Sequence, residues 1–100
     1  MNDIIIQHTQ QDLRGAFLIG DADERQAEMT YTRADPGKML IQHTEVGEAL
    51  RGKNIGYQLV HTAVEYARQH QLHILPICPF AASVFKKKPE FQDVLYTETS

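Results

Sequence analysis

Residues 50–59 read LRGKNIGYQL. A short loop rich in small and basic residues runs here into a helix, because apolar residues recur every four positions from Ile55 to Ala67. Such a junction gathers backbone N–H groups, the positive end of the helix dipole and cationic side chains, and all three favour a bound phosphate group. The stretch therefore predicts an anion-binding loop at the start of a helix over residues 56–70.

Strands are expected on both sides of this helix. Met39 and Ile41 share one parity in the strand before it and Val46 the other, which predicts a β-bulge. Pro76 interrupts the strand after it and is expected at a strand end or a splayed edge. The predicted elements are strands at residues 4–8, 14–19, 27–32 and 38–46, the helix at 56–70, a strand at 72–77, a helix at 79–87 and a last strand at 91–96.

This order, β-β-β-β-α-β-α-β, predicts an α+β fold, sandwich-like, with a mixed, mostly antiparallel sheet and two helices. Residues 1–100 are expected to form a single domain. The strands before and after the first helix should be parallel neighbours, so their C-terminal ends lie beside the start of that helix. On this topology Val46, the loop at residues 51–56 and Cys78 converge on one crevice.

Composition narrows the classes of partner. A formal charge of −3 argues against a nucleic-acid-binding protein, because such domains are usually basic. The sequence has no apolar run long enough to span a bilayer, so no membrane partner is expected. The single cysteine cannot form an intramolecular disulfide, which fits a reducing compartment. We expect a cytoplasmic protein.

Three motifs occur in order over about sixty residues. They are HTEV at residues 43–46, the loop at 50–56, and PICPF at 76–80, followed by Phe85 and PEF at 89–91. Together they resemble the GCN5-related N-acetyltransferase (GNAT) superfamily, and are most similar to its compact branch of stand-alone proteins of roughly 100 residues. The superfamily loop has the form Gln/Arg-x-x-Gly-x-Gly/Ala; Arg51 and Gly56 match its ends, and Asn54 replaces the first glycine. Asparagine tolerates a positive φ, so the loop geometry should survive.

The resemblance implies a site for acetyl-CoA. Pantetheine would lie between the two splayed strands that end at Val46 and near Cys78, and backbone N–H groups of residues 53–56 would hold the pyrophosphate. Arg51 and Lys53 would add positive charge. The residues expected to contact acetyl-CoA or CoA are Val46, Arg51, Gly52, Lys53, Asn54, Ile55, Gly56, Tyr57, Pro79 and Phe80.

Catalysis would have to depart from the common mechanism. Many larger members protonate the leaving CoA thiolate with a tyrosine, and Phe85 stands at the matching position. Cys78 could replace it, as a thiol acid or as a nucleophile that accepts the acetyl group; otherwise it is a small buried apolar residue. His43 could relay a proton, or it could only form a hydrogen bond within the sheet. Glu45 could act as a base through water, or it could only face the solvent. No metal site is expected.

The expected function is acetyl-CoA-dependent transfer of an acetyl group to an unidentified amine or protein acceptor. The first two strands are joined by only a few residues, so the acceptor-shaping helices of larger members look absent and the acceptor face should be open. Two alternatives stay open: a CoA- or acyl-CoA-binding module without efficient transfer, and an interaction protein that keeps only the fold. We expect a monomer or a weak dimer.

Overall fold

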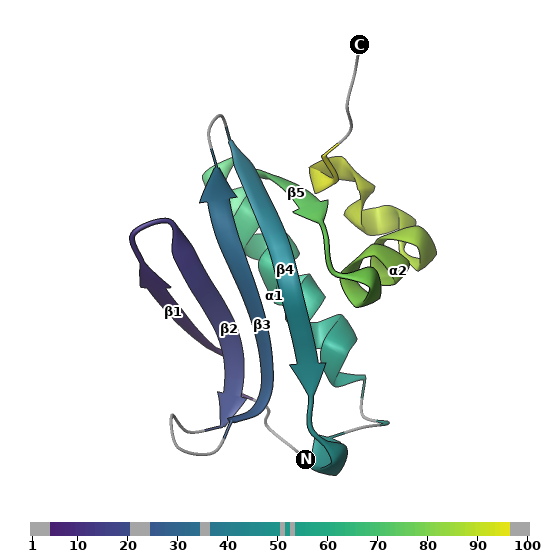
Figure 1. Ribbon diagram of the computed structural model, residues 1–100. Helices are drawn as coiled ribbons and strands as arrows, with labels where there is room; N and C mark the ends of the chain where they lie inside the picture. Colours follow the sequence, from purple (N-terminus) through teal and green to yellow (C-terminus); the bar gives the residue numbers. More distant parts are fainter. Residues whose placement is uncertain (1–4, 21–24, 35–36, 51, 53, 97–100) are drawn as a thin grey trace.

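A five-stranded sheet forms one layer of the molecule, and its strands follow each other in chain order (Figure 1). The computed structural model describes residues 5–20, 25–34, 37–50, 52 and 54–96. Strands β1 to β4 pair antiparallel, and β5 runs parallel to β4, so the predicted α+β class with a mixed, mostly antiparallel sheet is confirmed. The elements are β1 (Gln7–Gln11), β2 (Arg14–Gly20), β3 (Arg25–Ala34), β4 (Lys38–Val46), η1 (Glu48–Leu50), α1 (Ile55–His70), β5 (His73–Pro76), α2 (Pro79–Lys87) and η2 (Pro89–Val94).

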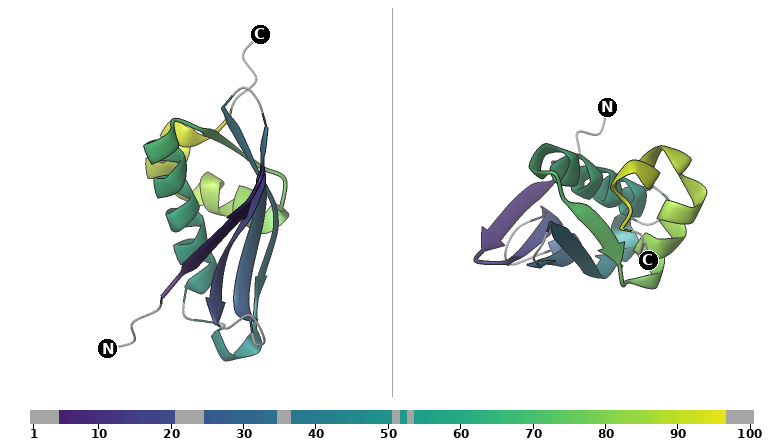
Figure 2. Two further views of the ribbon diagram at one scale, coloured as in Figure 1. Left: turned by 90° about the vertical axis from the view of Figure 1, so that its left-hand side faces the viewer. Right: turned by 90° about the horizontal axis from the view of Figure 1, so that it is seen from above.

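The core lies between the sheet and α1. The predicted apolar stripe of α1 is buried, from Ile55 to Ala67, against Met29, Tyr31 and Ile41 of the sheet. Figure 2 shows the helices on one side of the sheet, so the opposite face, here called the outer face, carries no helix among the described residues. None of the described helices is both long and apolar enough to cross a membrane.

The bulge predicted in β4 is confirmed. Thr30 pairs with His43 and Tyr31 with Ile41, which leaves Gln42 as one extra residue in β4. An extra residue reverses the side-chain alternation beyond it. The reversal decides which face each residue of the HTEV motif occupies.

Before the bulge, Met39 and Ile41 face α1; after it, Thr44 and Val46 take that face, since Thr44 pairs with the core residue Met29. His43 and Glu45 therefore lie on the outer face.

Strands β4 and β5 separate at the bulge. Their register ends at Ile41 opposite Pro76, as expected for a proline at a strand end. The carbonyl oxygen of Ile41 then accepts two hydrogen bonds, from the N–H groups of Ile77 and Cys78, both 3.0 Å long. Beyond this point β4 continues to Val46 without a β5 partner.

The expected last strand at residues 91–96 is wrong. Residues Pro89–Val94 form the 3₁₀ helix η2, and Leu95 makes a single bridge to Ile74. A 3₁₀ helix aligns residues three apart, which lets Phe91 and Val94 both enter the core.

The first strand lies later than expected. It covers Gln7–Gln11 instead of residues 4–8, because a two-residue turn with Asp12 at φ 56° pairs Gln11 with Arg14 and brings polar residues into the hairpin.

We predict that Gly15→Ala lowers the stability of the fold by about 1–3 kcal/mol, since overpacking a core costs that much. A Cβ at this position would lie 2.4 Å from the Tyr31 ring, which is buried and held by a 2.6 Å hydrogen bond between its hydroxyl and His8 Nε2. Urea unfolding measures the change. Thr9→Ala, on the exposed strand β1, should stay within about 0.5 kcal/mol of the parent. Equal midpoints for the parent and Gly15→Ala would contradict the prediction.

Candidate functional site

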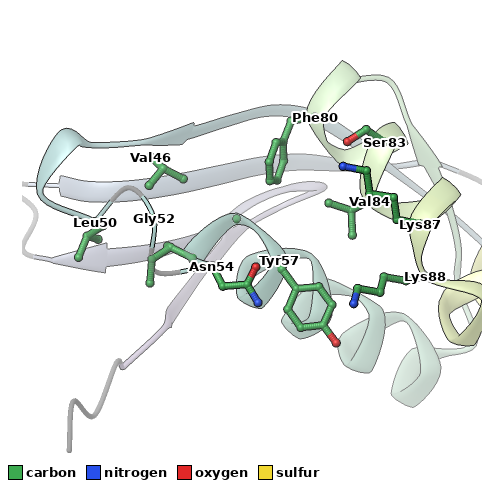
Figure 3. A pocket seen from close by; sticks show the side chains of 12 residues that line it. Val46, Leu50, Gly52, Asn54, Tyr57, Phe80, Ser83, Val84, Lys87 and Lys88 are labelled. Atoms are coloured by element: carbon green, nitrogen blue, oxygen red, sulfur yellow. The ribbon is translucent and has the colours of Figure 1, made fainter.

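A pocket of about 340 Å³ opens at the head of α1, between the end of β4 and one face of α2 (Figure 3). Seven of the ten residues expected to contact the cofactor line it. They are Val46, Gly52, Asn54, Ile55, Gly56, Tyr57 and Phe80. Pro79 does not line it, and Arg51 and Lys53 lie outside the described residues.

Two left-handed residues shape the loop at the start of α1. Gly52 has φ 81°, and Asn54 has φ 63° and ψ 28°, so the expectation that asparagine adopts a positive φ here is confirmed. Asn54 precedes α1 but makes no side-chain capping hydrogen bond, and the first turn of α1 carries no acidic residue. The first N–H groups of a helix have no partner within it. In α1 they therefore stay available to an anion.

Glycine is required at position 56 because the ring of Phe80 approaches its backbone closely. The Phe80 ring packs onto it so tightly that a Cβ would lie 2.1 Å from Phe80 Cζ. Phe80 stays 41% exposed and forms a wall of the pocket. The glycine thus lets α2 approach the head of α1.

Sequence reasoning missed the part of α2 that lines the pocket. Ser83, Val84, Lys87 and Lys88 all do so, together with Leu50. A run of lysines at the end of a helix is usually solvated. Instead, Lys88 Nζ lies 4.8 Å above the centre of the Tyr57 ring. The helical spacing of Phe80, Ser83 and Lys87 was the signal that could have placed them on one face.

Cys78 lies at the head of α2, as its N-cap residue, and is only 7% exposed. It is not among the residues that line the pocket. Burial raises the pKa of its thiol, but the backbone N–H of Ala81, the Thr44 hydroxyl and the backbone N–H groups of Phe80 and Thr44 together bring that pKa below its ordinary value. The environment of Cys78 therefore favours the thiolate more than an isolated cysteine does.

His43 and Glu45 lie beside each other on the outer face. His43 Nε2 is 3.6 Å from Glu45 Oε2, and the two side chains are 61% and 76% exposed. The structure thus brings these two predicted residues together but leaves them on the opposite face of β4 from Thr44, which faces Cys78. The described residues hold no cluster suited to a metal ion.

We predict that Asn54→Val destabilises the protein by about 1–2 kcal/mol, because a β-branched residue pays the full cost of the left-handed conformation. Asn54→Gly adopts that conformation freely and should stay within about 0.5 kcal/mol of the parent. Urea unfolding of both variants measures the difference. Similar midpoints for the valine and glycine variants would contradict a positive φ at this position.

Comparison with known proteins agrees with this geometry. A family model described as GCN5-related N-acetyl-transferase matches residues 16–94. A GCN5-like protein from Staphylococcus aureus, solved by NMR, is 33% identical, with a TM-score of 0.76 over 99% of this chain and 94% of its own.

Two more distant structures share the fold. An acetyltransferase from Bacillus subtilis in complex with CoA is 17% identical, with a TM-score of 0.65 over 85% of this chain and 74% of its own. An IAA acetyltransferase from Bacillus cereus is 20% identical, with a TM-score of 0.59 over 75% of this chain and 53% of its own. The chain belongs to the GCN5-related N-acetyltransferase family.

Proposed function

We propose that the protein binds acetyl-CoA in the pocket at the head of α1 and transfers the acetyl group to an amine. The observation that carries this proposal is the junction of an uncapped helix N-terminus with two parallel strands that separate beside it. The Bacillus subtilis relative holds CoA in the same fold, which supports the choice of ligand.

The described residues fit the parts of acetyl-CoA. The N–H groups of the first turn of α1 would hold the pyrophosphate, because the side chain of Asn54 does not cap them and the pocket opens beside them. Lys87 and Lys88 would add positive charge from α2. The free edge of β4 between the bulge and Val46 would pair with the amides of pantetheine. Arg51 and Lys53 remain predicted contributors.

Cys78 would carry the acetyl group. Its thiolate attacks the carbonyl carbon of the thioester, the bond from that carbon to the CoA sulfur breaks, and CoA leaves as a thiolate. An amine then attacks the acetyl group on Cys78, which forms the amide and restores the Cys78 thiolate. The proton lost by the amine finally neutralises the CoA thiolate, so the atoms balance.

The acceptor would approach over the outer face, which no described helix covers. There His43 would take the proton from the amine, and the Glu45 carboxylate beside it would stabilise the resulting imidazolium. The separation of β4 from β5 beyond Ile41 leaves no ladder between this face and Cys78.

A second candidate function is a CoA-binding module without efficient transfer. Phe85 is buried at the position where larger members carry an acid, and Cys78 does not line the pocket. Both observations favour binding without chemistry, and the two experiments that follow separate the candidates.

The first experiment tests binding. We predict that acetyl-CoA binds the parent protein and that Gly56→Val weakens binding about tenfold or more, because the new side chain displaces Phe80 into the pocket. Isothermal titration calorimetry measures both affinities. Gln69→Ala, exposed at the far end of α1, is the matched control and should bind like the parent. No binding to the parent at high micromolar acetyl-CoA would eliminate both candidate functions.

The second experiment tests chemistry. We predict that incubation with acetyl-CoA adds about 42 Da, one acetyl group, to the parent protein and nothing to Cys78→Ala. Intact-mass spectrometry detects the adduct, and hydroxylamine should remove it because it is a thioester. Transfer to an amine with full rate in Cys78→Ala would exclude the covalent route. Binding without any adduct or transfer would favour the binding module.

A further inference from the structure

Thr44 carries the one buried side-chain oxygen or nitrogen without a well-formed hydrogen bond among the described residues. Its Oγ1 is shielded from solvent, and leaving a buried hydroxyl unsatisfied costs about 1–3 kcal/mol. Native proteins rarely keep such a group without a role. The position of this hydroxyl in the fold suggests what the role is.

The bulge brings Thr44 to this position. If Gln42 were paired as a regular strand residue instead of bulged, Thr44 would point to the outer face and His43 would take its place. After β5 separates from β4 at Ile41, the N–H of Cys78 still donates to the Ile41 carbonyl, which keeps the head of α2 beside the part of β4 that carries Thr44. Two irregularities, the bulge of β4 against β3 and the end of its pairing with β5, are therefore needed to bring this hydroxyl toward the sulfur.

Several donors converge on the Cys78 sulfur. The backbone N–H groups of Phe80 and Ala81, in the first turn of α2, and the N–H and hydroxyl of Thr44, on β4, all lower the pKa of the Cys78 thiol as hydrogen-bond donors. Yet the thiol makes no capping hydrogen bond of good geometry, and Thr44 Oγ1 makes none either. A neutral thiol is a weak acceptor, whereas a thiolate accepts strong, charge-assisted hydrogen bonds. The donors thus surround a charge that is absent from the neutral state.

We propose that Thr44 is a positioning residue whose hydroxyl donates a hydrogen bond to the Cys78 thiolate. Its unsatisfied state beside the neutral thiol becomes a satisfied one when the sulfur is charged. The hydroxyl therefore holds the sulfur in place and lowers the free energy of the form that attacks the thioester. The catalytic benefit of this hydrogen bond depends on the proposed function. Its effect on the pKa of Cys78 can be tested independently of that function.

The test is the titration of Cys78 in the absence of any ligand. Because Cys78 is the only cysteine, ¹³Cβ labelling of cysteine gives one NMR signal that reports its ionisation. Thr44→Val keeps the shape and removes the hydroxyl. It should raise the titration midpoint by about one pH unit, which is about a tenfold loss of thiolate below the midpoint. Thr44→Ser keeps the hydroxyl and should restore the midpoint of the parent.

Two further measurements separate positioning from a general loss of structure. Thr44→Ala is a second variant without the hydroxyl and should move the midpoint as Thr44→Val does. Acetylation of Cys78 by acetyl-CoA should slow about threefold to tenfold in the two variants that lack the hydroxyl, while Thr44→Ser should react like the parent.

Coincident midpoints in the parent and in Thr44→Val would overturn the proposal, and so would a shift seen in Thr44→Val but not in Thr44→Ala. A shifted midpoint in a protein that never forms the acetyl adduct would support the role of Thr44 and contradict only the proposed transfer.

Discussion

The carbonyl oxygen of Ile41 accepts hydrogen bonds from two successive residues, Ile77 and Cys78. This double acceptance ends the parallel ladder, because Pro76 has no N–H to continue it and the chain turns directly into α2. The free end of β4, the position of Cys78 and the approach of α2 to the pocket all follow from that single point. A continued ladder would close the space in which the cofactor is proposed to lie.

The N-terminus of α1 lacks a side-chain cap from Asn54, and this lowers the stability of the helix. A capping side chain would stabilise the helix by about 1 kcal/mol, and α1 does without one. The apolar stripe of α1 offsets this, because each large side chain in it, such as Leu59, contributes about 2–5 kcal/mol by its burial. Burial of its middle therefore holds the helix, and its first N–H groups remain without a side-chain cap from Asn54.

Much of this arrangement could be predicted from the sequence. The period of the apolar residues after residue 54 defined α1, and the tolerance of asparagine for a positive φ predicted the conformation of Asn54. The mixed parity in β4 predicted the bulge. The inward orientation of Thr44 could not be predicted, because the alternation indicates a bulge but does not show at which residue the faces exchange. Thr44 was therefore overlooked between His43 and Glu45.

The other misses have physical causes of the same kind. Phe91 and Val94 are spaced for a 3₁₀ helix, but two apolar residues three apart also fit an irregular strand, and only the packing against Phe85 decides between them. Lys87 and Lys88 look like a helix end in water until the Tyr57 ring is found beneath Lys88. In each case a contact made by a distant segment overrides a local pattern.

The bulge also determines how the side chains of residues 43–46 are distributed between the two faces of β4. Thr44 and Val46 face the side of the pocket, and His43 and Glu45 face the side where no described helix shields an acceptor. Among the described residues no layer covers the outer face, so acceptor-binding groups would have to come from the sheet itself. On the proposed mechanism, groups for both substrates would stand on alternate positions of β4, so that the thickness of the strand alone would separate the proton acceptor from the sulfur. The bulge at Gln42 sets that alternation, because the same sequence paired as a regular strand would turn His43 to the inner face and Thr44 to the outer face.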